Sequence, residues 1–531
     1  MTAPAVPAPA PAPAGARLAV RPGRARIVLL FAAFVCAACG LVYELALISL
    51  GSFLVGNSVV QASVVLSVFV FSMGVGALLS KGLRRQPVIA FAVVEAILAL
   101  AGGLSVLALY AAFAWLDLYQ PALVAVSFLL GALVGAEIPL LMTLIQSVRP
   151  QDAGAAVADL SAADYVGALV GGLAFPFILL PRLGQLQGPL VVGVVNAIAA
   201  AVLAGWLFAP SLRRLHRNVV VGGLIGVVGV LGVAGAGSGR FEVSARQALF
   251  DDPIVHREQT PYQEIVLTES VSLRGERDLR LFLNGDLQFS SVDEYRYHEA
   301  LVHPAMAGPH RRVLVLGGGD GLATREVLRY PDVGQVVLVE LDARMIDLAR
   351  EDRRLTALNE RSLHDARVRV ETEDAFTWLA GGGNGLFDVI IADLPDADST
   401  ATAKLYTQEF YAVAGAALSP AGRMVVQAGS PAFAHHAFWC IDTTVRAADL
   451  STVPYHVDVP SFGDWGFVLS GRSAPSLRLP ATRPASLRSL DDSTLEAAAT
   501  FPPDRRVPDV EVSTLLHPVI LDYQRQGWRG E

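Results

Sequence analysis

Carboxylate side chains end or follow four successive predicted strands in the C-terminal half of this 531-residue chain. They are Asp320, Glu340, Asp374 and Asp393. The strand before Asp320 runs into a glycine turn at 317–319, and Glu340 follows about twenty residues later, the spacing at which an acid meets ribose hydroxyls. Because ligands of an open parallel sheet bind beyond the carboxyl ends of its strands, these acids should converge on one crevice.

The glycine turn itself contains no Lys or Arg, which argues against a phosphate-binding loop. A crevice that is lined by acids instead favours a positively charged ligand. The strand, the turn and a helix predicted over 322–330 together indicate the opening of a nucleotide-binding α/β domain.

Seven short segments of this half follow one another over about 210 residues. They are 260–263 (TPYQ), 283–288 (LNGDLQ), 293–303 (DEYRYHEALVH), 317–321 (GGGDG), 373–376 (EDAF), 393–396 (DLPD) and 405–411 (LYTQEFY). With these motifs the half resembles the spermidine synthase family of polyamine aminopropyltransferases, and the apolar N-terminal region resembles that of its membrane-bound bacterial subset. The resemblance implies a multi-span α-helical membrane region and a Rossmann-like, class I methyltransferase-like α/β domain preceded by a small β-rich module.

The resemblance also implies roles for the matching positions. Asp393 would be the catalytic base, and Asp396 would hold the distal ammonium of the acceptor. The residues expected to bind the amine and the aminopropyl group are Tyr297, His298, Asp320, Asp396 and Gln427. The residues expected to bind the nucleoside part of the co-substrate are Gln263, Gly317, Gly318, Gly319, Glu340, Asp374 and Ala375.

Asp320 bears on the choice between two sulfonium co-substrates. A class I methyltransferase has the same strand, turn and helix, and it binds S-adenosylmethionine with the amino-acid carboxylate near the turn. Asp320 would place a like charge beside that carboxylate, whereas it would attract the ammonium of the decarboxylated form. We therefore expect decarboxylated S-adenosylmethionine as the co-substrate, with no prosthetic group, and keep an S-adenosylmethionine-dependent methyltransferase as an alternative.

The acceptor should be an alkyl amine that must lose a proton, because such amines have pKa values near ~10. The loop that carries the expected base departs from the family pattern, since Pro395 stands before Asp396 rather than after it. Where many members present a tyrosine to the diamine, this chain offers Phe462 or Pro460. Putrescine is the default acceptor, and agmatine, cadaverine or a longer polyamine remain open.

Composition divides the chain into two unlike halves. Hydrophobic residues make up 53% of the chain and the mean hydropathy is +0.47, so membrane spans are expected. Residues 1–236 contain 12 Lys and Arg against 7 Asp and Glu; subtracting these from the chain totals of 41 and 49 leaves 29 against 42 for residues 237–531. The acidic enzyme-like half disfavours nucleic acid as a partner and suits a cationic substrate.

The N-terminal half predicts a multi-pass protein of the cell membrane. Apolar runs fall at 27–50, 58–80, 88–113, 121–147, 161–180, 188–209 and 218–236. Basic clusters at 21–26, 81–85 and 213–217 should mark the cytoplasmic side. Seven crossings would then place the enzyme half outside, although its ligand is a cytosolic metabolite. We therefore expect a cytoplasmic catalytic domain, with the 161–180 segment, broken by Asp164, Gly171 and Pro176, failing to span.

Five parts are expected along the chain. They are a disordered Pro/Ala-rich tail (1–25), a transmembrane helical domain (26–236), a β-rich module (237–310), a Rossmann-like catalytic domain (311–471) and a C-terminal tail that packs on it (472–531). A homo-oligomer formed through the synthase domain is also expected.

Polar residues inside the apolar runs allow more than one interpretation. Cys36 and Cys39 have the spacing of a metal or redox half-site, but no partner ligand is near in sequence, so we expect packing residues and no metal site. Glu44, Glu95 and Glu137 should face the interior of the bundle, as should Asp164. They could be structural hydrogen-bond partners or part of a cation path, so a polyamine-binding transport or sensing protein remains an alternative function.

Overall fold

The computed structural model describes residues 18–55, 58–83, 85–116, 118–148, 153–248, 250–271, 275–383, 385–484 and 486–527. The chain divides into two compact units, Met1–Asp251 and Asp252–Glu531. Most of the predicted N-terminal tail, residues 1–17, lies outside the described residues, as does Arg84 of the second basic cluster.

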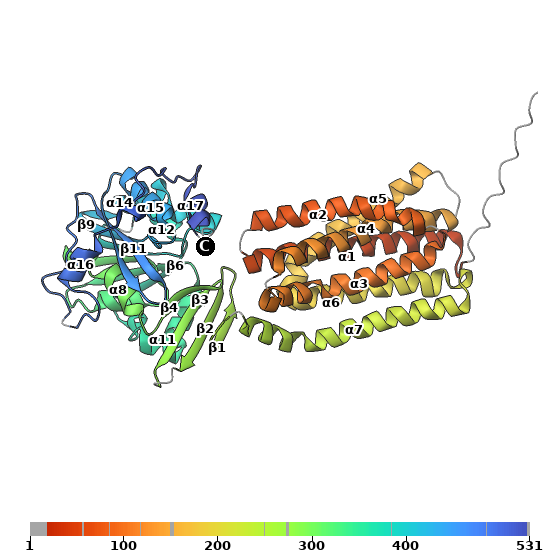
Figure 1. Ribbon diagram of the computed structural model, residues 1–531, viewed down its shortest axis with the longest axis horizontal. Coiled ribbons are helices and arrows are strands. Elements are labelled where there is room, and N and C mark those ends of the chain that lie inside the picture. Colours follow the sequence, from red (N-terminus) through yellow and green to blue (C-terminus); the bar gives the residue numbers. More distant parts are fainter. Residues whose placement is uncertain are drawn as a thin grey trace, which may run out of the picture. The chain divides into compact units, whose positions relative to one another are not determined.

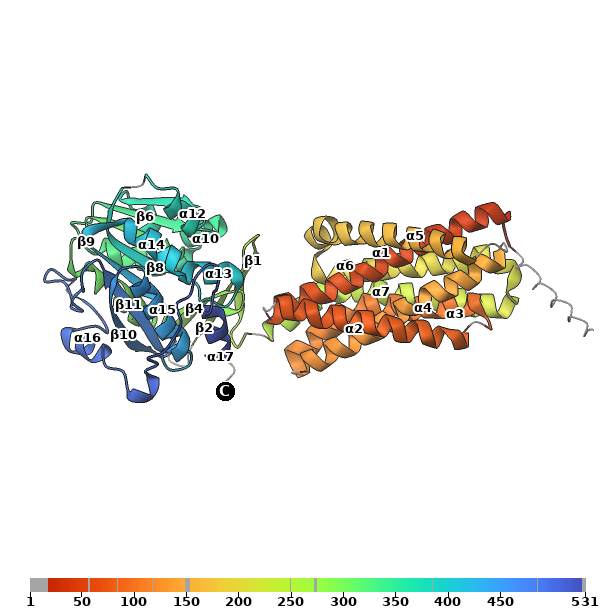
Figure 2. The same ribbon diagram turned by 90° about the horizontal axis from the view of Figure 1, so that it is seen from above.

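The described residues of the first unit form seven long helices that lie side by side (Figures 1 and 2). They are α1 (Pro22–Val55), α2 (Ser58–Leu79), α3 (Pro87–Ala111), α4 (Tyr119–Val148), α5 (Ala153–Ala174), α6 (Leu180–Ala201) and α7 (Arg214–Gln247). Short π-helical turns extend α3, α5 and α6 at Ala112–Leu116, Phe175–Leu179 and Val202–Leu207. Six helical stretches are long and apolar enough to cross a membrane, and one of them, Gly154–Leu207, is 54 residues long.

This 54-residue stretch contains a turn at Gly184, whose backbone angles (φ 70°, ψ −177°) are not helical. Before the turn, Asp159 forms an ion pair with Arg26 near the start of α1. At the turn, the Gln185 amide donates to the Ser49 hydroxyl near the end of α1, at 3.4 Å. The first part of the stretch therefore runs the length of α1.

The second part of the stretch returns to the start of α1. There the Leu207 carbonyl accepts a hydrogen bond from the Ala19 backbone N–H at 3.1 Å, just before α1 begins. A stretch of 54 residues is more than twice the ~20 residues that a single crossing needs. It thus passes along the bundle twice, and α1–α7 make seven passes.

In this bundle residues 161–180 are helical throughout and are not broken at Gly171 or Pro176. That the segment does not cross the membrane stays a prediction. Helix α5 runs beside α1, and Cβ atoms added to Gly167 and Gly171 would lie 2.1 and 2.4 Å from the carbonyl oxygens of Phe34 and Ala38. Small residues at this spacing let two membrane helices approach closely. The glycine that the sequence suggested as a break is part of the contact with α1, and Pro176 is accommodated in a π-helical turn.

Seven passes place the two ends of the helical region at opposite ends of the bundle. The described basic residues Lys81, Arg85 and Arg213 lie in the connections at the end where α1 begins, and Arg214 begins α7 there. Helix α7 ends at the other end of the bundle, at Gln247. The first strand of the second unit begins at Ile254.

The second unit begins with a small antiparallel sheet in the order β1-β2-β3-β4. Its strands are β1 (Ile254–Gln259), β2 (Glu264–Val271), β3 (Arg277–Leu283) and β4 (Asp286–Ser290). The predicted Asn-Gly hairpin joins β3 to β4, and Asn284 and Gly285 both have positive φ, 54° and 96°, as a tight two-residue turn requires.

A seven-stranded mixed sheet in the order β10-β11-β9-β8-β5-β6-β7 forms the centre of the unit. Its strands are β5 (Arg312–Gly317), β6 (Gln335–Glu340), β7 (Val368–Thr372), β8 (Phe387–Asp393), β9 (Leu418–Gln427), β10 (Ser451–Val459) and β11 (Gly463–Gly471). The strands β9-β8-β5-β6-β7 are parallel, whereas β10 and β11 pair antiparallel.

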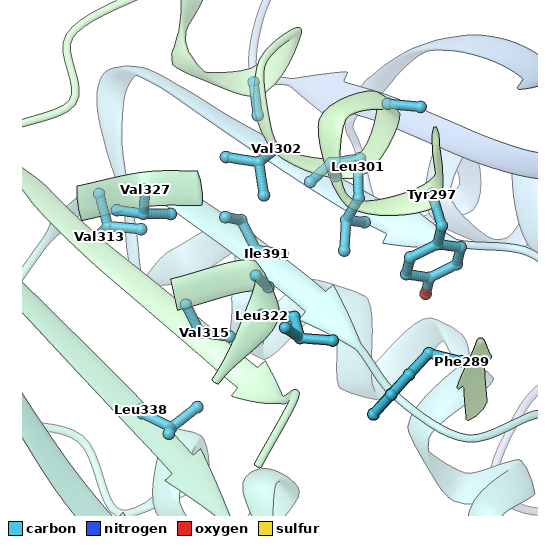
Figure 3. Close-up of a cluster of buried hydrophobic side chains, with 14 of the residues drawn as sticks. Phe289, Tyr297, Leu301, Val302, Val313, Val315, Leu322, Val327, Leu338 and Ile391 are labelled. Atoms are coloured by element: carbon cyan, nitrogen blue, oxygen red, sulfur yellow. The ribbon is translucent and has the colours of Figure 1, made fainter. Parts of the chain in front are cut away.

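Helices cover both faces of this sheet (Figure 1). They are α8 (Glu294–Val302), α9 (Leu322–Leu328), α10 (Ala343–Glu351), α11 (Arg353–Leu358), α12 (Ala375–Ala380), α13 (Thr400–Ala403), α14 (Gln408–Ala416), α15 (His435–Ala447), α16 (Asp492–Ala498) and α17 (Ile520–Gly527). Successive strand residues point to opposite faces, so Val313 and Val315 join one core cluster while Leu314 and Leu316 join the other. Figure 3 shows the first cluster, in which Val313, Val315 and Ile391 pack together with the ring of Tyr297 at its margin.

The seven-pass arrangement can be tested with single cysteines in a background in which all three native cysteines are replaced. Lys81→Cys and Arg213→Cys should react with a membrane-impermeant maleimide from one side of the membrane, and Arg182→Cys, beside the turn at Gly184, from the other side. All three side chains lie at exposed positions. Labelling of Arg182→Cys and Lys81→Cys from the same side would show that 161–180 does not cross.

Candidate active site

The register of two central strands sets the geometry of the site. Strand β5 pairs in parallel with β8, and Gly317 at the end of β5 stands opposite Asp393 at the end of β8. The chain leaves β5 toward β6 on one side and returns to β8 on the other, so the two strand ends flank the point where the strand order reverses. Ligands of open α/β sheets bind at such a point.

Glycines at the end of β5 allow the acids of neighbouring strands to come close. A Cβ atom on Gly318 would lie 2.9 Å from an Asp393 carboxylate oxygen, and one on Gly319 would lie 2.8 Å from a carboxylate oxygen of Glu340. Gly318 also has a positive φ of 64°. The turn can therefore hold a ligand against its backbone only because its residues lack side chains.

Asp393 accepts a short hydrogen bond from the Tyr297 hydroxyl, at 2.6 Å. Burial raises the pKa of Asp393, although the positive charge of His298 and the Tyr297 hydrogen bond oppose the rise. Burial and the Asp393 charge also raise the pKa of Tyr297, so the phenol stays protonated and keeps donating. The phenol thus fixes one carboxylate oxygen of Asp393.

His298 lies beside this pair and is held by Glu294, whose carboxylate contacts Nδ1 at 2.8 Å. Burial lowers the pKa of His298, but the hydrogen bond and the charge of Glu294 outweigh it, so the pKa is raised. Glu294 is held in turn by two hydrogen bonds from Arg325, at 3.0 and 2.9 Å. His298 is therefore a positioned, readily charged group behind the acids of the site.

Asp320 occupies the turn after β5, where the Leu322 backbone N–H donates to its carboxylate at 2.8 Å. Burial raises the pKa of Asp320 to about 6, His298 opposes the rise, and the charge of Asp393 adds to it. Because the charge of Asp393 raises the pKa of Asp320, a cation bound between the two acids would be attracted by both.

Glu340 ends β6 and lies against the glycine turn. Burial raises its pKa to about 7, and the charges of Asp342 and Asp320 add to the rise. Gln263 reaches the same place from the β-rich module, since its side-chain amide donates to Asp342 at 3.1 Å. The Thr260 hydroxyl donates to the same Asp342 oxygen at 2.7 Å, which ties the module to the sheet edge.

Asp374 follows β7 and caps α12, because its carboxylate accepts from the Thr377 backbone N–H at 3.0 Å. Burial would raise its pKa, but the ion pair with Lys404, at 2.7 Å, helps to lower it. Ala375 is buried directly after it. Asp374 therefore stays ionised, and one of its oxygens is already engaged by a lysine.

Asp396 is held by two amide groups from distant parts of the chain. Gln427, at the end of β9, donates to one carboxylate oxygen at 3.1 Å, and Gln524 of α17 donates to the other at 3.1 Å. Burial raises the pKa of Asp396, and the Gln427 hydrogen bond opposes the rise. Gln427 also donates to the Tyr406 hydroxyl at 2.7 Å, so Asp396 stands in a fixed polar frame.

Aromatic residues of the 459–467 region cover Tyr297. The ring of Phe462 packs edge-on against Tyr297 with centroids 6.1 Å apart, and Phe467 lies 5.3 Å away. Of the two residues that the sequence offered at this place, Phe462 is thus the one that meets Tyr297. Burial raises the pKa of Asp286 of β4 to about 6, and the charges of Asp398 and Asp396 add to the rise.

The structure therefore places the predicted residues around one edge of the sheet. Asp320, Glu340 and Asp393 meet at the glycine turn, Tyr297 and His298 stand behind Asp393, and Asp396 lies with Gln427. Sequence reasoning missed Glu294, Arg325, Lys404 and Gln524. Their positions follow from long-range packing, and the short motifs carry a local signal only for Glu294, which lies within the 293–303 segment.

Comparison with known proteins agrees with these motifs. The spermine/spermidine synthase domain matches residues 294–475. Polyamine aminopropyltransferase 1 of Streptomyces coelicolor is 56% identical over 507 residues, which are 95% of this chain and 95% of that protein. The polyamine aminopropyltransferase of Mycobacterium tuberculosis is 48% identical over 523 residues, with 95% and 97% covered. A solved spermidine synthase from Thermotoga maritima is 24% identical, covers 47% of this chain and 84% of that one, and has a TM-score of 0.41.

The buried support of His298 can be tested by Glu294→Gln. The substitution removes the charge that pairs with both His298 and Arg325, and among the described residues Arg325 keeps only Glu326 as a charged partner. Breaking a buried pair is unfavourable by about 3 kcal/mol or more. We expect calorimetry of the full-length protein in detergent to show the unfolding temperature of the enzyme half lowered by roughly 6 °C or more. Asp522→Asn, in an ion pair at the surface, is the control and should change little. Equal unfolding temperatures for both variants would contradict the role given to Glu294.

Proposed function

Because this chain belongs to the polyamine aminopropyltransferase family, which includes the spermidine synthases, we propose that it moves the aminopropyl group of decarboxylated S-adenosylmethionine to an amine acceptor. The observation that carries this proposal is the enclosed set of carboxylates at the switch point. Asp320 and Asp393 stand on neighbouring strand ends, and Asp396 follows three residues later. Such a site suits two cations, one on the donor and one on the acceptor.

The proposed reaction joins the acceptor nitrogen to the carbon beside the sulfonium. The carbon–nitrogen bond forms while the carbon–sulfur bond breaks, and the electron pair of that bond stays on sulfur, which leaves as neutral methylthioadenosine. The amine must shed a proton, and Asp393 is the proposed acceptor of that proton. Its raised pKa makes it a better base. The Tyr297 hydroxyl donates to one of its oxygens and so fixes the orientation of the carboxylate.

Asp320 is the proposed partner of the aminopropyl ammonium. Its pKa is about 6, because burial and the charge of Asp393 disfavour the ionised form. An ammonium beside it would favour the charged form, whereas the amino-acid carboxylate of S-adenosylmethionine would add a further like charge. The nucleoside part would lie along Gly317–Gly319, with Glu340 at the ribose, Gln263 beside it, and Asp374 with Ala375 at the adenine.

Asp396 is the proposed anchor of the acceptor's distal ammonium. Its two oxygens are oriented by Gln427 and Gln524. Putrescine is the acceptor that we propose, because a short diamine can place one nitrogen at Asp393 and the other at Asp396. Phe462 in place of a tyrosine removes one hydroxyl from this end of the site.

The cell membrane is the proposed location, with the enzyme half on its cytoplasmic side. The distribution of basic residues and the proposed chemistry oppose each other here. Basic connections are expected in the cytoplasm, and they lie at the end of the bundle opposite to the end of α7. We give priority to the chemistry, since the co-substrate is a cytosolic metabolite. The proposal also includes a homo-oligomer formed through the enzyme half.

The base can be tested by comparing two substitutions in the full-length protein. Asp393→Asn should lower kcat on the order of 10²-fold or more and leave nucleoside binding nearly intact, because general-base catalysis contributes about that factor. Asp396→Asn should mainly raise KM for the amine, at least about tenfold, which is ~1.4 kcal/mol. Release of methylthioadenosine measures both. Asp365→Asn, at the opposite edge of the sheet, is the control and should change neither constant. Near-wild-type kcat in Asp393→Asn would contradict the role of Asp393 and make His298 the next candidate base.

The choice of co-substrate can be tested by calorimetry between pH 5 and 8. Decarboxylated S-adenosylmethionine should bind at least about tenfold more tightly than S-adenosylmethionine at pH 8, a difference of ~1.4 kcal/mol. Below about pH 6 Asp320 becomes protonated and loses its attraction for the ammonium, so affinity should fall as pH decreases. Asp320→Asn should shrink both effects, whereas Asp347→Asn at the surface should not. Equal affinities for the two compounds would remove the charge argument, and a methylated product would overturn the proposed function.

A further inference from the structure

Four helices of the first unit bring polar side chains together in the interior of the bundle. Cys36 lies on α1, Glu95 on α3, Glu137 on α4 and Asn196 on α6. All four are between 0 and 3% exposed. The Cys36 sulfur and one carboxylate oxygen from each of Glu95 and Glu137 all lie within 4.8 Å of one another. Cys36 therefore has possible metal ligands beside it. They come from other helices, so the residues near Cys36 in the sequence do not reveal them.

Several polar atoms of this cluster have no hydrogen-bond partner among the described residues. They are both carboxylate oxygens of Glu95, one of Glu137, and the oxygen and nitrogen of the Asn196 amide. Asn196 is fully buried and lies beside Glu95. Buried polar groups are nearly always paired, and two carboxylates without counter-charge are strongly unfavourable. Either a proton shared by the two carboxyl groups or a bound positive species must compensate the cluster.

The depth of the cluster strengthens this requirement. Glu137 lies eleven residues before Val148, where α4 ends. At 1.5 Å per residue this is roughly 16 Å, or about half of the ~30 Å hydrocarbon core of a bilayer. Bulk water does not compensate a charge at that depth. The positive species must therefore be bound by the side chains themselves.

The donor atoms select the kind of cation. A metal ion binds the Cys36 thiol as the thiolate, which loses its proton on binding. One divalent ion then balances the thiolate and one carboxylate, while the second carboxyl group keeps its proton and binds through its carbonyl oxygen. Ligand atoms within 4.8 Å of one another leave space for a single atom between them, whereas an alkylammonium would need space for its methylene groups as well. Sulfur among the donors disfavours Mg²⁺ and Ca²⁺, which take oxygen ligands, and suits Zn²⁺, which accepts sulfur and carboxylate together.

We propose that Cys36, Glu95 and Glu137 bind one divalent transition-metal ion of the zinc type, with the Asn196 amide oxygen as the fourth ligand. Four protein ligands close the coordination of such an ion, which is typical of a structural site. The ion would link α1, α3, α4 and α6 in the interior of the bundle. This role is independent of the aminopropyl transfer proposed for the second unit.

Element analysis of the full-length protein in detergent tests the proposal. Protein loaded with Zn²⁺ and then dialysed should retain about one zinc per chain, and Cys36→Ala, Glu95→Gln and Glu137→Gln should each retain at least tenfold less. Cys39→Ala and Glu44→Gln are matched controls, since both residues are buried on α1 but lie outside the ligand set. These controls should retain the metal.

A spectroscopic measurement on the wild-type protein covers the case in which a ligand variant does not fold. Substitution of Co²⁺ for Zn²⁺ should give a thiolate-to-cobalt charge-transfer band in the near ultraviolet, and Cys39→Ala should keep that band. Retention of no metal by the wild-type protein would overturn the proposal and indicate two carboxyl groups that share a proton. A wild-type cobalt spectrum without the thiolate band, or metal retained equally by all three ligand variants, would also overturn it.

Discussion

The pairing of β5 with β8 is the constraint on which the site depends. Because Gly317 stands opposite Asp393, the glycine turn and the expected base share one edge, and any shift of register would move one away from the other. The absence of side chains in the turn then lets Glu340 and Asp393 approach it to contact distance. The other residues named at this edge hold these acids in place. Tyr297 and His298 stand behind Asp393, Lys404 forms an ion pair with Asp374, and two glutamine amides donate to Asp396.

Much of this site could be predicted from sequence because its signals are local. A strand that ends in glycines, acids at strand ends and an Asn-Gly hairpin each follow from short-range rules, and the structure has all three. The supporting residues could not be predicted in this way. Arg325 reaches Glu294 across 31 positions, Lys404 reaches Asp374 across 30, and Gln524 reaches Asp396 across 128. Such contacts depend on how helices pack on the sheet, which no short segment encodes.

The N-terminal helical unit shows a different limit of sequence reasoning. Along the sequence Gly171 indicates a break, because glycine weakens an isolated helix, yet in the bundle it is one of the points where α5 touches α1. The same residue type has opposite meanings in water and between membrane helices. Likewise Glu95 and Glu137 look like isolated acids along the chain, whereas the bundle places a carboxylate oxygen of each within 4.8 Å of one thiol. Apolar length predicted the helices well, and it carried no information on which of their faces meet.

The contact between α17 and Asp396 has a consequence for how the chain is handled. Gln524 lies seven residues before the last residue, and it supplies one of the two amides that orient the Asp396 carboxylate. A purification tag, a protease cut or a truncation at this terminus would disturb a residue of the proposed acceptor pocket while the glycine turn stayed intact. Preparations that differ only at the C-terminus could then rank the same amines differently, and a cleavable N-terminal tag is the safer design for comparing acceptors.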